Sequence, residues 1–182
     1  MGIRNLRADE IDVRVQSTAS YLDKDKKEKA YAILLLYKDA RCDMNILDEV
    51  YGITGWKRSH QEIAGRLYCT VEIWDDIKEQ WINKQDVGTE SNTEKEKGQA
   101  SDSFKRACFN IGIGRELYTA PSLIIWLNES DYSINVKDNK KYVNLDKKLK
   151  FRVIDIGINE DKQIMSLKIA DQAGKVRFES KP

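Results

Sequence analysis

Alternation of apolar and polar residues gives the clearest strand signal of the chain, at residues 66–74. Every second side chain from Leu67 to Ile73 is apolar, and the residues between them are polar or aromatic. This pattern is typical of a half-buried antiparallel strand. The segments 56–63 and 80–88 flank it and are predicted to be its neighbours in a three-stranded meander.

Helical spacing of apolar residues predicts two helices before this meander. Leu6, Ile11 and Val15 recur at roughly helical intervals, and Asp9 is a residue type that caps helices, so a short amphipathic N-terminal helix is expected. The segment 40–52 has one apolar face and ends at a glycine, which can terminate a helix.

A longer amphipathic helix is predicted at 99–118, after a stretch at 89–97 that has no apolar residue and predicts a solvated loop. One arc of this helix is apolar, with Ala100, Phe104, Ala107, Cys108, Ile111 and Tyr118. The opposite arc carries Lys105, Arg106, Phe109 and Asn110.

Apolar-rich segments elsewhere predict further strands. An unbroken apolar run at 30–37 indicates a buried strand, and the region beyond Pro121 adds segments at 122–127, 150–158, 163–170 and 175–179. The resulting order is helix, strand, helix, meander, helix and more antiparallel strands. We therefore expect an α+β fold.

The composition is that of a folded protein, with 41% hydrophobic and 9% aromatic residues. No apolar run approaches the roughly 20 residues that cross a bilayer, and no signal-peptide pattern opens the chain, so we expect it to be neither membrane-spanning nor secreted. Cys42, Cys69 and Cys108 are widely spaced without a C-x-x-C, which is typical of reduced thiols in a cytosolic protein.

The net charge of +1 does not indicate a polyanionic partner, although residues 137–182 alone carry a net charge of +5. A nucleic-acid site would therefore be a local patch. On the 99–118 helix, Lys105 and Arg106 can hold phosphates, and the neighbouring ring of Phe109 can stack on a base.

Enzyme motifs are absent from the sequence. It has no G-x-x-x-x-G-K-[ST] loop, and the Gly-Ile-Gly segment at 112–114 lacks the third glycine of a dinucleotide loop. His60 is the only histidine of the sequence, so a structural role is favoured for it over a catalytic triad or a metal site. Asp75 and Asp76, with Glu72, leave one enzymatic alternative open, a small metal-dependent nuclease, beside the simpler role of turn residues.

Two motifs resemble a known family. The segment 97–118, with its Lys-Arg pair and its Gly-Arg-Glu-Leu-Tyr ending, resembles the signature helix of the single-strand annealing proteins that unite Rad fifty-two with the phage Sak proteins. The segment 38–56, with Lys-Asp-Ala-Arg and Leu-Asp-Glu-Val-Tyr-Gly, is similar to the helix and turn before the meander in that family. Residues 9–14 are similar to the family's N-terminal helix, and the phage Sak type is the closer form.

The resemblance implies a β-β-β-α core in a single annealing domain spanning 1–182, with the recognisable core at 38–121 and a β-rich C-terminal extension at 122–182. It implies ATP-independent annealing of single-stranded DNA in recombination and repair, by an oligomeric ring or filament that needs no cofactor, no metal and no catalytic residue. It also implies a phage or prophage protein in the bacterial cytoplasm, with a phage exonuclease or a single-strand-binding protein as a further partner.

The family's DNA-binding lysine-arginine pair falls on Lys105 and Arg106, and its backbone-gripping arginine on Arg41. Phe109 stands where the animal proteins carry a further basic residue, which leaves two roles open for its ring: stacking on a base, or packing against a neighbouring subunit or the meander. Weaker candidates in the meander are Lys57, Arg58, Arg66 and Tyr68. A scaffold protein without DNA binding is the other alternative left open.

Overall fold

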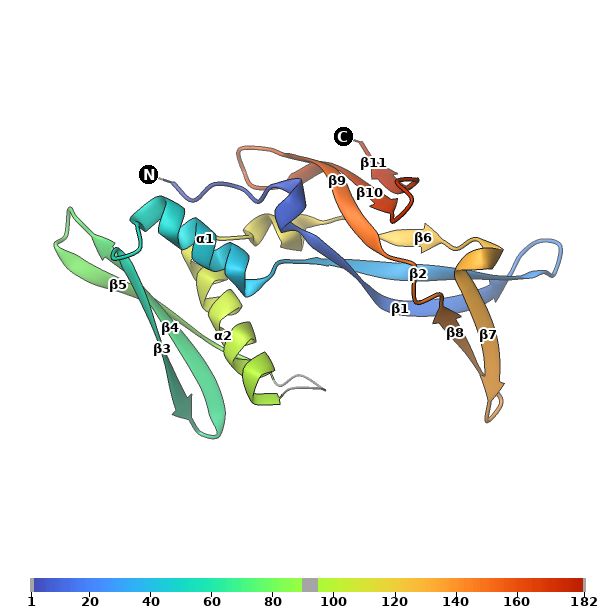
Figure 1. The fold of residues 1–182 in the computed structure, drawn as a ribbon, viewed down its shortest axis with the longest axis horizontal. Helices are drawn as coiled ribbons and strands as arrows, with labels where there is room; N and C mark the ends of the chain where they lie inside the picture. Colours follow the sequence, from blue (N-terminus) through green and yellow to red (C-terminus); the bar gives the residue numbers. More distant parts are fainter. Residues whose placement is uncertain (1, 90–94, 182) are drawn as a thin grey trace. The chain divides into compact units, whose positions relative to one another are not determined.

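The computed structural model describes residues 2–89 and 95–181, and its contacts divide the chain into two compact units (Figure 1). Unit 1 comprises Met1–Leu6 and Lys38–Arg115, and unit 2 comprises Arg7–Tyr37 and Glu116–Pro182. Unit 1 therefore contains most of the segment 38–121, whereas unit 2 joins the C-terminal segment to strands from the N-terminal part of the chain.

Unit 1 contains a three-stranded antiparallel sheet with the order β3-β4-β5 (Figure 1). Its elements are α1 (Ala40–Tyr51), β3 (Trp56–Ile63), β4 (Arg66–Asp75), β5 (Gln80–Val87) and α2 (Lys95–Ile111). The three strands match the segments predicted from alternation, and the helix predicted at 40–52 is confirmed as α1.

One face of this sheet and both helices supply the core of unit 1. Alternate residues of β4 are buried, and α2 packs on β4 and β5. The fully buried apolar side chains are Ile46, Leu47, Cys69, Val71, Phe104, Ala107, Cys108 and Ile113. All three cysteines are free and buried, in agreement with the expectation of reduced thiols.

The predicted 99–118 helix has different ends in the structure. α2 begins earlier, at Lys95, so the last three residues of the predicted 89–97 loop belong to its first turn, and residues 90–94 lie outside the described residues. It ends at Ile111 because Gly112 has a φ of +118°, which a helix does not continue. Tyr118 instead lies in the 3-10 helix η2 (Arg115–Thr119) and is 75% exposed, so its predicted place on the apolar arc was wrong.

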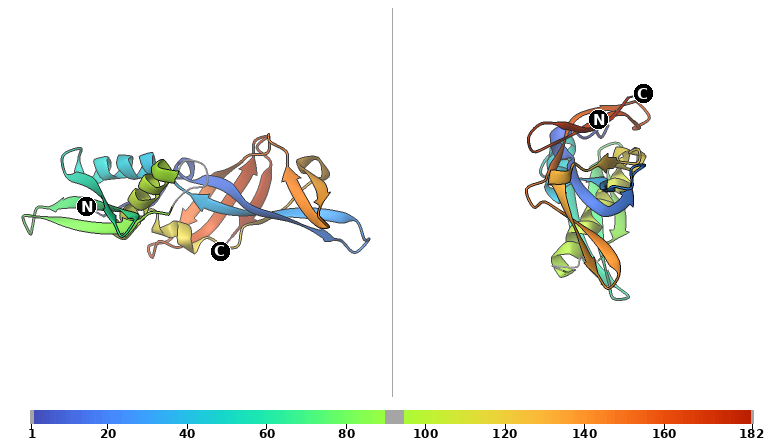
Figure 2. Two further views of the ribbon diagram at one scale, coloured as in Figure 1. Left: turned by 90° about the horizontal axis from the view of Figure 1, so that it is seen from below. Right: turned by 90° about the vertical axis from the view of Figure 1, so that its right-hand side faces the viewer.

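Unit 2 is built almost entirely of strands, and its long β1–β2 hairpin is seen in blue in Figure 2. A six-stranded sheet has the order β11-β10-β9-β1-β2-β6, and β7 and β8 form a separate two-stranded sheet. The elements not yet given are η1 (Ala8–Glu10), β1 (Asp12–Leu22), β2 (Glu28–Tyr37), β6 (Ile124–Trp126), η3 (Glu129–Asp131), β7 (Tyr132–Lys137), β8 (Lys140–Leu145), β9 (Phe151–Ile158), β10 (Ile164–Asp171) and β11 (Val176–Ser180).

A buried cluster of charges ties together separate parts of unit 2. The guanidinium of Arg177, on β11, forms ion pairs with Asp131 at 2.6 Å and with Asp171 at 3.2 Å. It also donates to the carbonyl of Trp126 on β6 at 3.3 Å. The Arg177 side chain is only 5% exposed, and its positive charge compensates the negative charges of both carboxylates.

The predicted fold class was wrong. The described chain is mostly antiparallel β, with 48% strand and 22% helix, three sheets and only two α-helices, rather than an α+β fold of an N-terminal helix and a β-β-β-α core. No helix among the described residues is long and apolar enough to cross a membrane.

The N-terminal helix is the clearest error. Residues 8–10 form only a 3-10 turn, and 12–22 form β1, an eleven-residue strand paired with β2. Several residues of β1 are β-branched and favour an extended backbone, and the apolar run of β2 offers a pairing partner. The helical spacing of Leu6, Ile11 and Val15 arose because Leu6 and Ile11 are buried in irregular segments on either side of η1.

Candidate nucleic-acid interface

All eight predicted DNA-binding residues lie in unit 1, and the structure distributes seven of them over two surfaces, with Arg58 on neither. The first, which we call the helix surface, combines the start of α1 with the exposed arc of α2. The second, which we call the outer sheet face, is the face of the β3-β4-β5 sheet that points away from α2.

Arg41 and Lys105 come together on the helix surface around Asp39, the N-cap of α1. The Asp39 carboxylate accepts a hydrogen bond from the Arg41 backbone at 2.7 Å and forms an ion pair with the Arg41 side chain at 3.0 Å. The hydrogen bonds from Arg41 lower the pKa of Asp39, and the charge of Lys105 lowers it further. Lys105 itself makes no ion pair within 4.0 Å of any described residue, so its amine is available to an anion.

Arg106 and Phe109 lie on the other part of the exposed arc, toward β5. The Arg106 guanidinium pairs with Asp86 at 3.2 Å, and this carboxylate also accepts from the Asn110 amide. Arg115 donates to the carbonyls of Phe109 and Asn110, each at 2.9 Å, and so caps the C-terminal end of α2. Its guanidinium lies 5.8 Å from the centre of the Phe109 ring, which adds a cation that the prediction did not include.

A buried ion pair, Lys38–Asp43, lies beneath the helix surface in the interior of unit 1. The Lys38 amine donates to one carboxylate oxygen of Asp43, and both side chains are almost completely buried. The second oxygen of Asp43 has no hydrogen-bond partner among the described residues. Burial raises the pKa of Asp43 to about 6, against the opposing charges of Lys38 and Lys105. The stem of Lys38 passes so close to Gly114 that a Cβ there would lie 2.5 Å from the lysine Cε.

The outer sheet face receives Lys57, Arg66 and Tyr68. Lys57 on β3 is paired in register with Glu72 on β4, and their charged groups lie 3.5 Å apart. Arg58 is one residue away from Lys57 and therefore points to the α2 side, where its guanidinium lies 4.6 Å from the centre of the Phe104 ring. Arg58 is thus separated from the other meander candidates.

Two tryptophans of the outer sheet face were not predicted as site residues. Trp74 on β4 and Trp81 on β5 are register partners whose rings meet edge to face at 5.5 Å. The Lys57 amine lies 4.2 Å from the centre of the Trp81 ring. The two tryptophans are 38% and 37% exposed, so part of each ring is open to solvent. Alternation alone placed Trp74 on this face, but only the β4–β5 register brings Trp81 beside it.

Two of the residues considered for metal or acid–base chemistry, Asp75 and His60, make contacts within the fold. Asp75 accepts hydrogen bonds from the backbones of Ile77 and Lys78, each at 3.0 Å, and so stabilises the β4–β5 turn. His60 contacts the carbonyl of Ala100 on α2 at 3.2 Å. Within residues 2–89 and 95–181, no group of three or more His, Cys, Asp or Glu side chains is placed to hold a metal ion.

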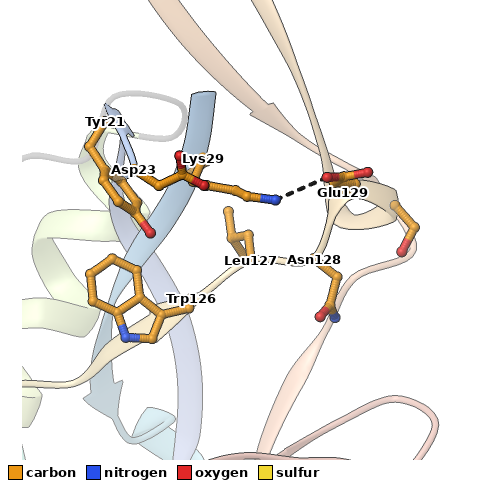
Figure 3. Close-up of a pocket in the computed structure, with 9 residues that line it drawn as sticks. Tyr21, Asp23, Lys29, Trp126, Leu127, Asn128 and Glu129 are labelled. Carbon is orange, nitrogen blue, oxygen red and sulfur yellow. Dashed lines mark hydrogen bonds and ion pairs between the residues drawn. The ribbon is translucent and has the colours of Figure 1, made fainter. Parts of the chain in front are cut away.

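A pocket in unit 2 involves none of the predicted residues (Figure 3). Its walls include the partly exposed rings of Tyr21 and Trp126, which lie edge to face at 5.3 Å. The only lysine among its lining residues, Lys29, is paired with Glu129 at 3.0 Å. The pocket thus presents aromatic surface, and its lysine is already paired with a carboxylate.

Comparison with known proteins finds no match to the chain among protein-family models, curated proteins or solved structures. Its function is therefore inferred from its own residues and contacts.

Proposed function

We propose that unit 1 binds single-stranded DNA and that the protein, as a homo-oligomeric ring or filament, anneals complementary strands without ATP. The observation that carries the proposal is the outer sheet face, where Lys57 lies over Trp81 and Trp81 meets Trp74. Exposed aromatic rings beside a cation are the combination on which successive bases stack while phosphates are held nearby. Stacking is indifferent to sequence, which annealing requires because any complementary pair must be accepted.

The helix surface supports the same proposal with phosphate contacts. Lys105 is available, and the pairs Arg41–Asp39 and Arg106–Asp86 are at least partly exposed to solvent. Exposed ion pairs contribute only about 0–1 kcal/mol, so a phosphate can compete with the carboxylate for the arginine. Because the chain is nearly neutral as a whole, repetition of the patch in an oligomer would supply the affinity that one copy lacks.

The test measures binding of a fluorescent oligo(dT) by anisotropy, and annealing of complementary labelled strands without ATP. We expect Trp81→Ala to weaken binding by roughly 1–3 kcal/mol, the contribution of a stacked base, and Trp81→Phe to lose less. Trp126→Ala is the matched control, since it removes an exposed tryptophan that lies in unit 2.

The oligomeric mass of each variant is measured on the same preparation by light scattering. Loss of affinity at unchanged mass supports base stacking on the outer sheet face. Loss of mass together with affinity would assign the tryptophans to a subunit contact. A wild-type protein that neither binds nor anneals single strands would refute the proposal.

A further inference from the structure

A run of uncompensated positive charge lies in unit 2, at residues 137–150. The segment contains six lysines and two aspartates. One lysine, Lys141, is paired with Glu28 at 2.6 Å. The others make no ion pair within 4.0 Å of any described carboxylate: Lys137, Lys140, Lys147, Lys148 and Lys150. By contrast, three of the predicted cations of unit 1 have a carboxylate partner.

Three of these lysines lie on the β7–β8 hairpin, whose two strands are labelled in Figure 1. Its two-residue turn, Asp138–Asn139, has φ values of +50° and +57°, as in the tight turns that join twisted strands. The register places Lys137 opposite Lys140 and Asn135 opposite Tyr142. Since side chains alternate along a strand, one face carries Ser133, Asn135, Lys137, Lys140, Tyr142 and Asn144. We call it the hairpin outer face.

The other face of the hairpin is turned toward the rest of unit 2. Ile134 and Val143 are half-buried there, and the Val143 carbonyl accepts a hydrogen bond from the Thr18 hydroxyl of β1 at 3.0 Å. Lys141 shares this face and reaches Glu28 on β2. The hairpin outer face is therefore the free one, and Tyr142 on it is 48% exposed.

The pairing of Lys137 with Lys140 places two like charges opposite each other. Like charges directly opposite each other on neighbouring strands destabilise a sheet, and no described carboxylate compensates these two. Lys141, the next residue, shows that a lysine of this hairpin pairs where a glutamate is provided. Charge that destabilises the free protein and is left without a partner is expected at a surface that meets an anion.

We propose that the hairpin outer face, together with Lys147 and Lys148 in the turn that follows β8, is a second binding surface for single-stranded DNA. The lysines contact phosphates, and the exposed ring of Tyr142 contacts a base. The six residues of β8 extend about 20 Å, so tip and base lysines contact separate phosphates of one strand. No aliphatic side chain lies on this face, which argues against insertion into a lipid surface.

This inference rests on the proposed function, which identifies the polyanion as single-stranded DNA. It adds a second binding surface in unit 2. Annealing brings two strands together, and a surface in each unit lets one protein contact both. The surfaces can be tested separately because they share no residue.

The experiment compares Lys137→Gln/Lys140→Gln with Lys141→Gln, using labelled oligo(dT) at several salt concentrations. We expect the double variant to bind roughly tenfold more weakly and to reduce the slope of log affinity against log salt by roughly 1.4, or about 0.7 for each lost phosphate contact. Its melting temperature should be unchanged or higher, because a like-charge pair is removed. Lys141→Gln should keep the salt slope and lower the melting temperature.

Tyr142→Ala and Tyr142→Phe test the base contact, and only the alanine variant should lose affinity. Wild-type affinity and salt slope in the lysine double variant would overturn the second surface while leaving the proposed function intact. Absence of DNA binding by the wild-type protein would overturn both. Lysine-dependent binding to phosphatidylserine vesicles, with DNA binding unaffected by the double variant, would assign the hairpin to a membrane surface instead.

Discussion

Removing the buried amine of unit 1 by Lys38→Met should strongly destabilise the protein at alkaline pH. Methionine keeps an unbranched stem of similar length beside Gly114, so the substitution mainly removes a charge. Asp43 would then be fully buried without its cation, and one of its oxygens already has no partner among the described residues. Breaking a buried pair in this one-sided way costs roughly 3–5 kcal/mol.

The pH dependence follows from the pKa of Asp43. Burial raises this pKa from 3.8 to about 6 in the folded protein, even with Lys38 beside it. The folded state therefore holds the proton more tightly than the unfolded state, and the free energy of unfolding falls as the pH rises from about 4 to about 6. A difference of about 2 pKa units corresponds to about 3 kcal/mol.

Lys38→Met removes the largest influence that lowers this pKa, so the fall in stability should extend above pH 6. At pH 5 the Asp43 carboxyl is mainly protonated in the folded state with or without Lys38. The variant should therefore match the wild type at pH 5 and be less stable by up to about 3 kcal/mol near pH 8, because protonation of Asp43 limits the loss to about 1.4 kcal/mol for each pH unit above the wild-type pKa of about 6.

Urea unfolding followed by tryptophan fluorescence is the assay, because three of the four tryptophans lie in unit 1. The control is the double variant Lys38→Met/Asp43→Leu, which removes both charges and should recover most of the stability at pH 8. A Lys38→Met variant that loses less than about 1 kcal/mol at pH 8, or that loses the same amount at every pH, would refute this reasoning.

Three further predictions concern other contacts. Gly114→Ala combines a φ of +76° with the clash against the buried lysine and should lower the melting temperature more than Gly174→Ala, which has a φ of +83° but nothing within 4 Å of the new Cβ. Lys105→Gln/Arg106→Gln should weaken oligo(dT) binding and reduce its salt slope by roughly 1.4, with an unchanged circular dichroism spectrum. Arg177→Met should destabilise unit 2 by roughly 3–5 kcal/mol in urea unfolding followed by circular dichroism, because it leaves two aspartates unpaired.

The parts of the fold that were predictable are those in which burial imposes a period. β4 alternates because one of its faces packs against α2, and that alternation is visible in the sequence. The β7–β8 hairpin was not predicted because one of its faces is wholly polar and the other only half-buried, so its strands lack a strong apolar period. Its signal is the Asp-Asn turn between polar strands, which is weaker.

The error in fold class has a different cause. β1 lies between β2 and β9 in the sheet of unit 2, and its pairing with the distant β9 cannot be read from local spacing. The prediction of an N-terminal helix therefore gave more weight to a few apolar residues at helical intervals than to the β-branched residues that favour a strand. Long-range pairing overrode a weak local pattern, as it does wherever a strand has a ready partner.

The candidate site shows the same division between local and distant information. Lys105, Arg106 and Phe109 were correctly placed away from the buried arc of α2, because that follows from helical periodicity. The partner of Arg106 was not predictable, since Asp86 lies on another element, and neither was the meeting of Trp74 with Trp81. Sequence thus locates cations and rings but not the carboxylates that neutralise them or the rings that join them. For a protein that binds a polyanion, this difference decides which cations are available, and it shifts attention from Arg106 toward Lys105 and the unpaired lysines of the β7–β8 hairpin.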